Sequence, residues 1–267
     1  MRPTSVVFRT GDTIATMWFD GKLDMQKSRK FMVFCHGLPS HPYQHNPAKV
    51  EKFLEMGYVL VYPDYAGTWA SYGTMSWEKC TGSVVDVVNL LKKGKCTELY
   101  GNKEIKWPVG DIILVGVSFG GAIALVAGAK SRDVKKIISI AGPTNWRDHS
   151  RIEGEESEPI GELYYSIKRG WDNLWRIPSK NEWKRLVDGS ADINPVDYID
   201  ILKDKDVFLI HGTEDSVVSP KRSVDLNNSL KKGKGRHEIV LLDGERHLNS
   251  DVLMHNKVNR KLLKWLD

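Results

Sequence analysis

Residues 112–121, Ile-Ile-Leu-Val-Gly-Val-Ser-Phe-Gly-Gly, decide the fold. The run Ile112–Val115 is continuously apolar, as in a strand buried on both faces, and the small apolar residues after it predict a helix packed tightly on a sheet. Between the two, the segment 116–120 matches the pattern G-x-S-x-G, in which a serine occupies a strained strand-to-helix turn that exposes its hydroxyl. Flanking side chains must be nearly absent from such a turn, which explains the glycines. The stretch predicts that Ser118 is a nucleophile; the alternative is an ordinary strand–turn–helix junction with an incidental serine.

Further apolar runs predict strands on both sides of this stretch. They are Val6–Phe8, Ile14–Phe19, Phe31–Cys35, Tyr58–Tyr62, Ile137–Ile140, Val207–Ile210 and Ile239–Leu242. Helices are expected between them, at Pro47–Met56 (with Asn46 as N-cap), Trp77–Lys93, Phe119–Ala129, Pro220–Lys231 and Val252–Trp265. Strands that alternate with helices imply an α/β fold with a mainly parallel sheet covered by helices on both faces. The first two strands are close together in sequence and predict an antiparallel start.

The stretch 142–200 interrupts the alternation. It holds four of the nine tryptophans and an acidic cluster: Trp146, Trp171, Trp175 and Trp183, with Glu153, Glu155, Glu156 and Glu158. A connection this long inside a compact domain usually has its own structure. We expect a small, mostly helical cap inserted into a core domain formed by residues 1–141 and 201–267. The four tryptophans are candidates for lining a substrate pocket; the alternative is that they fill the core of the cap.

A second loop is suited to stabilise an oxyanion. The predicted strand Phe31–Cys35 runs directly into His36-Gly37-Leu38-Pro39. A tetrahedral oxyanion needs two N–H donors, and the backbone amides of Leu38 and Phe119 are the candidates. His36 itself is interpreted as a structural histidine and not as a base.

Two later loops supply a candidate acid and base. The strand Val207–Ile210 ends in His211 and is followed by the pair Glu214-Asp215, of which Asp215 is favoured as the acid, with Ser219 fitting the N-cap of the next helix. The strand Ile239–Leu242 is followed by a glycine turn and then by His247. A general base must reach the serine hydroxyl from a loop, so His247 is the candidate base. The chain order Ser118, Asp215, His247 is the Ser–acid–His order of G-x-S-x-G hydrolases.

With these motifs the sequence resembles the α/β-hydrolase superfamily over nearly its whole length. The segment 116–121 is similar to the G-x-S-[YF]-G-G elbow of prolyl-oligopeptidase-like (S9-type) catalytic domains. Further similar segments are Asn194-Pro195, residues 211–215 with Val218 and Pro220, and Pro63–Thr68, where Ala66 replaces a frequent arginine. Small esterases share these motifs, and His36–Pro39 resembles the HGxP loop of several hydrolase branches. The resemblance implies the α/β-hydrolase fold with a helical cap insertion and Ser118, Asp215 and His247 as the triad.

Two observations narrow the function that the resemblance implies. The 267-residue chain is too short to carry the N-terminal propeller of true oligopeptidases, which argues against peptidase activity. Dehalogenases and epoxide hydrolases with an HGxP loop use an aspartate nucleophile, and Ser118 speaks against them. The function expected is cleavage of carboxylic esters through an acyl-enzyme. The alternatives are a small S9-like peptidase or acylaminoacyl hydrolase and a non-catalytic binding protein with the hydrolase fold.

Composition excludes other classes of protein. The net charge of +5, spread over 39 basic and 34 acidic residues, gives no indication of nucleic-acid binding. The three cysteines argue against a disulfide framework, and His41, His45 and His149 lack the spacing of metal ligands. No cofactor is predicted, nor is a signal peptide or a membrane span, and a reducing cytoplasm is the expected location. A small ester or short peptide is the expected partner, and a homo-oligomer is compatible with these features.

Overall fold

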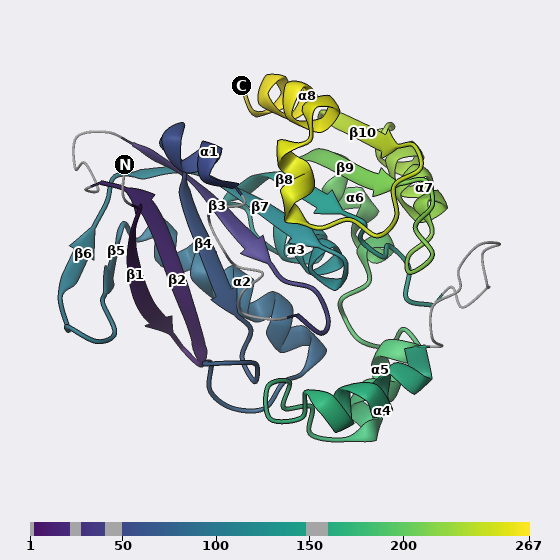
Figure 1. Cartoon of the computed structure of the whole chain (residues 1–267), viewed down its shortest axis with the longest axis horizontal. Coiled ribbons are helices and arrows are strands. Elements are labelled where there is room, and N and C mark those ends of the chain that lie inside the picture. Colours follow the sequence, from purple (N-terminus) through teal and green to yellow (C-terminus); the bar gives the residue numbers. More distant parts are fainter. Residues whose placement is uncertain (1–2, 22–27, 41–49, 148–159) are drawn as a thin grey trace.

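The computed structural model describes residues 3–21, 28–40, 50–147 and 160–267. In this part of the chain, eight strands form one sheet in the order β1-β2-β4-β3-β7-β8-β9-β10 (Figure 1). The strands are β1 Pro3–Thr10, β2 Thr13–Asp20, β3 Arg29–Cys35, β4 Val59–Asp64, β7 Val109–Val117, β8 Val134–Ile140, β9 Asp206–Gly212 and β10 His237–Leu242. β1 pairs antiparallel with β2 and β2 antiparallel with β4, whereas all later pairs are parallel, as the sequence predicted.

The predicted strands are confirmed, with longer bounds. Only the run Tyr58–Tyr62 begins early, one residue before β4. The continuous apolar runs are the most buried, because helices cover both faces of the sheet there. A short hairpin of β5 (Lys95–Thr97) and β6 (Glu104–Lys106) was not predicted, and it lies beside the edge strand β1.

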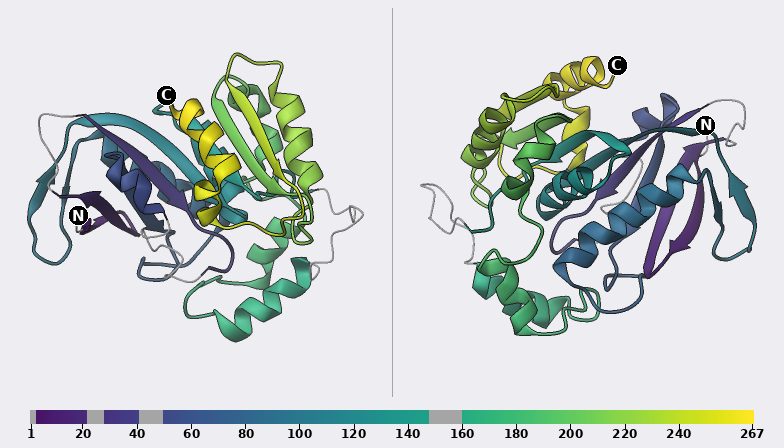
Figure 2. Two further views of the ribbon diagram at one scale, coloured as in Figure 1. Left: turned by 45° about the horizontal axis from the view of Figure 1, so that its top comes forward. Right: turned by 180° about the vertical axis from the view of Figure 1, so that it is seen from behind.

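Helices pack on both faces of the sheet (Figure 2). One face carries α2 Trp77–Lys92, α3 Phe119–Lys130, α6 Ile199–Leu202 and α7 Pro220–Leu230, and the other carries α1 Glu51–Glu55 and α8 Asn256–Leu266. The Ser219 hydroxyl accepts a hydrogen bond from the Lys221 N–H, so the predicted N-cap of α7 is confirmed. None of the helices described is both long and apolar enough to span a membrane.

Two predicted helices differ from the structure. The helix predicted at Pro47–Met56 is described only from residue 50 and consists of the single turn α1, while Asn46 and Pro47 lie outside the described residues. The helix predicted at Val252–Trp265 is divided, because a 3-10 turn, η4 (Ser250–Met254), ends at His255. His255 has extended backbone and its side chain accepts from the Lys257 N–H, so it caps the start of α8.

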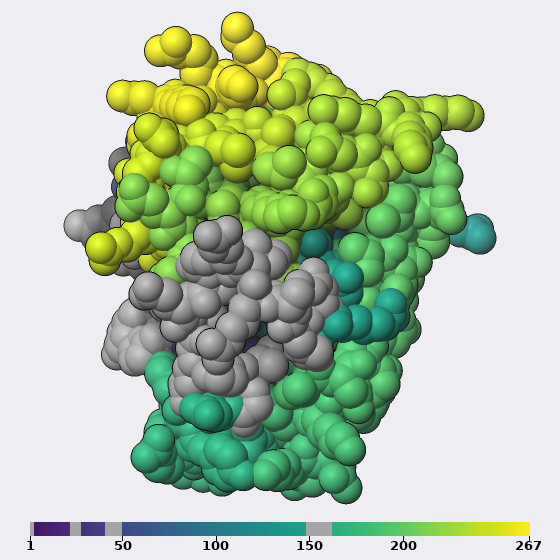
Figure 3. Space-filling view, turned by 90° about the vertical axis from the view of Figure 1, so that its right-hand side faces the viewer, coloured from purple at the N-terminus to yellow at the C-terminus, as the bar shows by residue number. Residues whose placement is uncertain are grey.

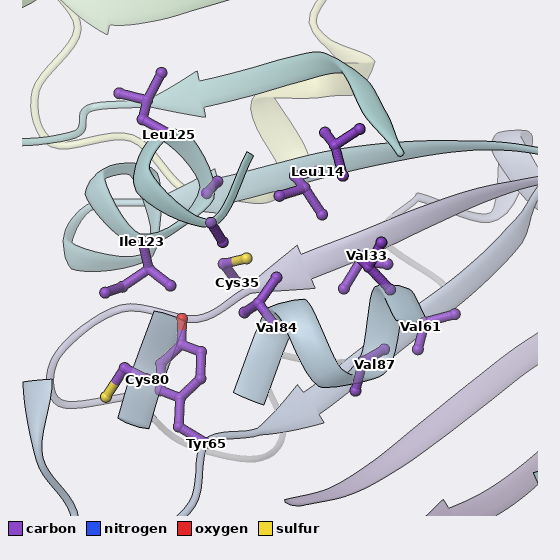
Figure 4. Close-up of a cluster of buried hydrophobic side chains, with 14 of the residues drawn as sticks. Val33, Cys35, Val61, Tyr65, Cys80, Val84, Val87, Leu114, Ile123 and Leu125 are labelled. Carbon is purple, nitrogen blue, oxygen red and sulfur yellow. The ribbon is translucent and has the colours of Figure 1, made fainter. Parts of the chain in front are cut away.

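Each face of the sheet buries its own hydrophobic cluster. Figure 4 shows Val33, Val61 and Leu114 of the sheet packed with Val84 of α2 and Ile123 of α3. The opposite face packs Phe34 on Tyr62 and Phe208 on Trp265, with ring centroids 4.8 and 5.4 Å apart. Cys35, Cys80 and Cys96 are all buried and unbridged. These clusters hold the carboxyl ends of the parallel strands in fixed register at one edge of the sheet.

The stretch 142–200 contains α4 (Ile160–Gly170), α5 (Lys180–Val187) and a 3-10 turn, η3 (Pro195–Tyr198). The green helices α4 and α5 lie beside one end of α2 (Figure 1), and the Trp183 ring of α5 packs on Trp77 of α2. In the space-filling view of Figure 3, this stretch forms the lower part of the face shown. Glu153, Glu155, Glu156 and Glu158 lie outside the described residues. The division into a core domain and a cap at 142–200 remains a prediction.

The segment between α4 and α5 is bonded to the loop that follows β4. The Trp69 N–H donates to the Leu174 carbonyl over 2.8 Å, and the Arg176 N–H donates to the Gly67 carbonyl over 2.9 Å. The Arg176 guanidinium donates to the carbonyls of Gly73 (3.0 Å), Trp69 (3.1 Å) and Ser71. The partly buried Arg176 side chain therefore helps to join the segment between α4 and α5 to the loop after β4, although the two are far apart in sequence.

Candidate active site

Ser118 lies at the turn between β7 and α3, in the position that its motif predicted. Its backbone has a positive φ of 54°, a strained conformation for a residue with a side chain. A Cβ at Gly120 would overlap the Cys35 carbonyl oxygen, so the turn can approach β3 only if this residue is glycine. The Ser118 N–H donates to the Ile140 carbonyl over 2.8 Å, which fixes the turn against β8.

The loop after β3 passes directly over this turn. A Cβ at Gly37 would lie 3.6 Å from the Ser118 Cβ, an ordinary van der Waals contact. Phe119 is the first residue of α3, so its N–H is unbonded within the helix and lies at the positive end of the helix dipole. The Leu38 amide, one residue beyond Gly37, remains the second predicted oxyanion donor.

His36 is a structural residue of this loop. It is buried, its ring stacks on Tyr65 with centroids 4.0 Å apart, and its Nδ1 lies 2.9 Å from the Ser40 hydroxyl. The Tyr65 hydroxyl donates to the His36 carbonyl over 3.0 Å. Tyr65 thereby fixes the peptide that leads into the predicted oxyanion loop, a contact that no sequence motif indicated.

Asp215 follows β9 and is 3% exposed. Its Oδ1 accepts from the backbone amides of Val217 (2.9 Å) and Val218 (3.0 Å). Its Oδ2 lies 2.7 Å from His247 Nδ1 and 3.1 Å from His211 Nε2. Burial opposes ionisation, but these hydrogen bonds outweigh it and hold the pKa of the Asp215 carboxyl well below its usual range.

His247 lies in the loop between β10 and η4, with 25% of its side chain exposed. Because the Asp215 carboxylate accepts at Nδ1, the Nε2 of the neutral ring carries the lone pair that a general base needs. Close packing at Gly212, where a Cβ would overlap the Glu245 and Arg246 carbonyls, brings this loop against the Asp215 loop. Among the described residues, no hydrogen bond joins His247 to the Ser118 hydroxyl; such bonds commonly shorten when substrate binds.

The neighbouring acid has a different environment. Glu214 is exposed, and its backbone N–H donates to the Glu245 carbonyl over 2.9 Å. The structure therefore brings Asp215 rather than Glu214 to His247. Within the described part of the chain, no group of three or more potential ligands could hold a metal ion, and His41, His45 and His149 lie outside it.

The four predicted pocket tryptophans occupy different environments. Trp175 is fully buried, with its ring centroid 6.2 Å from that of Phe119 and 5.3 Å from that of His36. Trp146 is partly exposed and its ring also lies 6.2 Å from Phe119. Trp183 is buried against Trp77, and Trp171 is partly buried against Trp69. Trp146 is the one of the four that both neighbours Phe119 and retains exposed surface.

A model of the X-Pro dipeptidyl-peptidase (S15) family matches residues 19–161. The chain belongs to this family. The matched segment contains Leu38, Ser118 and Phe119 and ends before Asp215 and His247.

The curated relatives that match are much longer than this chain. It is 24% identical over 226 residues to the Xaa-Pro dipeptidyl-peptidase of Pediococcus pentosaceus, covering 72% of this chain and 27% of the relative. It is 25% identical over 247 residues to the Xaa-Pro dipeptidyl-peptidase of Lacticaseibacillus rhamnosus, covering 80% of this chain and 30% of the relative. The chain spans less than a third of the length of these relatives.

Solved structures of similar fold cover almost the whole chain. A Pyrococcus furiosus esterase aligns with a TM-score of 0.67 at 18% identity, covering 99% of this chain and 90% of the esterase. Est1E of Butyrivibrio proteoclasticus with ferulic acid bound has a TM-score of 0.68 at 19% identity, covering 97% and 98%. An acylaminoacyl peptidase of Pyrococcus horikoshii has a TM-score of 0.58 at 15% identity, covering 99% and 40%. The S15 chain described here has the α/β-hydrolase fold, as its motifs predicted.

Proposed function

We propose that this protein hydrolyses carboxylic esters through an acyl-enzyme, with Ser118, His247 and Asp215 as its triad. The observation that supports it best is the 2.7 Å hydrogen bond between Asp215 and His247 Nδ1. This pair lies at the same edge of the sheet as the positive-φ turn of Ser118.

The mechanism follows from the roles that the geometry allows. His247 Nε2 takes the hydroxyl proton while Ser118 Oγ attacks the acyl carbonyl carbon, and the amides of Leu38 and Phe119 donate to the oxyanion. The protonated ring, stabilised by Asp215, then gives its proton to the leaving alcohol. Water, deprotonated by the same nitrogen, attacks the acyl-enzyme, and the proton returns to Ser118 as the acid leaves.

Peptide-bond cleavage is the second candidate. Membership of the S15 family and two relatives named Xaa-Pro dipeptidyl-peptidase favour it. The chain matches less than a third of each relative's length, so the activity named for the relatives comes to this chain only as a proposal. The same triad would cleave either acyl bond, and the leaving group distinguishes the two candidates.

The test combines covalent labelling with a matched substrate panel. We expect a fluorophosphonate to label the wild-type protein and not Ser118→Ala, and kcat to fall by about a thousandfold or more in the variant. Specific activities on p-nitrophenyl esters and on an Xaa-Pro p-nitroanilide separate esterase from peptidase. Wild-type turnover by folded Ser118→Ala would refute the triad, and faster anilide than ester cleavage would favour the peptidase.

The tryptophans test where the acyl group binds. We expect Trp146→Ala to change the preference for ester chain length, because each buried CH₂ contributes up to about 0.8 kcal/mol. Trp183→Ala is the matched control, since its ring packs on Trp77 and its loss should lower stability without changing the preference. A uniform loss of kcat/KM in Trp146→Ala that follows a lower melting temperature would show that it only supports packing.

A further inference from the structure

The proposed triad has a second histidine on its acid. His211 is the sixth residue of β9, is fully buried, and lies with Nε2 3.1 Å from Asp215 Oδ2 and 2.8 Å from the Val218 carbonyl oxygen. Its other nitrogen, Nδ1, lies 2.7 Å from the Ser223 hydroxyl of α7. The ring is therefore held by a strand, a loop and a helix at once.

The partners of His211 determine where its proton is. The Val218 carbonyl oxygen can only accept, so Nε2 carries a hydrogen and shares it between that oxygen and Asp215 Oδ2. This holds whichever atom donates in the pair of Nδ1 and Ser223, because a hydroxyl can do either. Asp215 Oδ2 thus accepts from two histidines, one rigid and buried and one in a partly exposed loop.

The two oxygens of Asp215 are fixed from different parts of the fold. Oδ1 is bonded by the amides of its own loop, Val217 and Val218, whereas Oδ2 is bonded from strand β9 through His211. His247 lies in a loop, so its orientation depends on the position of the oxygen that it meets. Without His211, Oδ2 would have His247 as its one remaining partner among the described residues.

We propose that His211 is a positioning residue for the reaction: it holds Asp215 Oδ2 where His247 Nδ1 binds, and Ser223 holds the His211 ring in place. The proposal rests on the triad of the proposed function. His211 does not touch the reacting atoms, and it acts through Asp215 and His247.

A matched pair of amides separates this role from simple packing. Glutamine places its amide nitrogen near the position of histidine Nε2, whereas asparagine places it near Nδ1. His211→Asn should therefore lose the bond to Asp215 and keep a partner for Ser223, and His211→Gln should keep the bond to Asp215. We expect kcat to fall about tenfold to a hundredfold in His211→Asn with KM nearly unchanged, as for other residues that orient a catalytic group, and His211→Gln to recover most of the loss.

Two further readouts keep the test independent of folding and of catalysis. The melting temperature is measured for each variant. The proton resonance of His247 Nδ1–H is followed in the downfield region of the NMR spectrum. If His211→Asn does not fold, Ser223→Ala decides, because it loosens the ring and leaves its contact with Asp215; a fall in kcat at constant KM supports the proposal, and an unchanged kcat and resonance overturn it. Folded His211→Asn with wild-type kcat and resonance, or equal losses in the two amide variants, also overturns it.

The same experiment separates failure of this proposal from failure of the proposed function. If the fluorophosphonate does not label the wild-type protein, the hydrolase mechanism is wrong. The Nδ1–H resonance of wild type and of His211→Asn then still shows whether His211 holds Asp215 at His247: a resonance lost or moved in the variant supports it, and an unchanged one overturns it.

Discussion

Two aspartates stand at the same edge of the sheet and differ in how they are solvated. Asp64 is the last residue of β4, and Asp215 lies three residues beyond β9, a strand that runs parallel to it. Asp215 is surrounded by four donors, two histidine nitrogens and two amides. Asp64 has the Ala70 backbone N–H as its one donor among the described residues, and burial raises the pKa of its carboxyl to about 7.

The difference shows that burial alone does not decide the charge of a carboxyl group at this edge. Removal from water disfavours the ionised form of both residues, and at Asp215 its donors, together with the electrostatic interaction with His247, outweigh this cost. The end of a parallel strand positions an acid, and the loop beyond it determines whether that acid is a carboxylate at neutral pH. Asp215 can therefore orient and stabilise a charged His247, whereas Asp64 could not do so over the same range of pH.

The largest expected effect comes from removing the charge of Asp215. In Asp215→Asn we expect kcat to fall about 10³- to 10⁴-fold, because an amide can present N–H to His247 Nδ1 and favour the wrong tautomer. Glu214→Gln is the matched control, and its kcat on the best ester should stay within about threefold of wild type, the range of an exposed residue outside the site. A greater loss in Glu214→Gln than in Asp215→Asn would identify Glu214 as the acid.

The next effect concerns stability in acid. Because the folded-state pKa of Asp215 is lowered, its contribution to the free energy of unfolding is complete above the unfolded value near 4 and is lost as the pH falls below it. Between pH 5 and 2.5, wild type should lose about 2 kcal/mol more stability than Asp215→Asn. Urea unfolding at a series of pH values measures this, and parallel curves for the two proteins would contradict it.

The smallest effect is expected at Asp64 and has the opposite sign. Its raised pKa means that the folded state binds the proton more tightly, so stability falls as the pH rises from about 4 to about 7. Asp64→Asn keeps an acceptor for the Ala70 N–H and should increase the free energy of unfolding by about 1 kcal/mol more at pH 8 than at pH 6. The exposed Asp111→Asn is the control. A gain in Asp64→Asn of equal size at both pH values would mean that ionisation of Asp64 is not its cause.

Much of the fold could be predicted because its signals are local. Continuous apolar runs such as Ile112–Val115 specify strands buried on both faces, and Ser219 before Pro220 specifies the start of a helix. The hairpin of β5 and β6 was not predicted, since Lys95–Thr97 and Glu104–Lys106 are short and largely charged or polar. The break at His255 was missed for a related reason, because one capping side chain interrupts an otherwise regular apolar pattern.

The candidate site is predictable to the extent that steric constraints appear in the sequence. Ser118 was predicted because its turn requires glycine at fixed positions, and Asp215 and His247 because their loops follow strands in a set order. The contacts of His211 and Tyr65 could not be predicted. Each depends on a carbonyl or hydroxyl that the folded chain brings near, and no residue pattern encodes such a partner.

The bonds of Arg176 also set a time order on the assembly of the molecule. Its guanidinium meets carbonyls of Trp69 and Gly73 that lie 107 and 103 residues earlier in the chain. During synthesis at about 5–20 residues per second, those carbonyls must bind water for about 5–20 seconds before the arginine has been made. Closing so long a segment also costs entropy that local turns do not incur. The loop after β4 should therefore reach its final conformation late, after the strands that flank it have already paired.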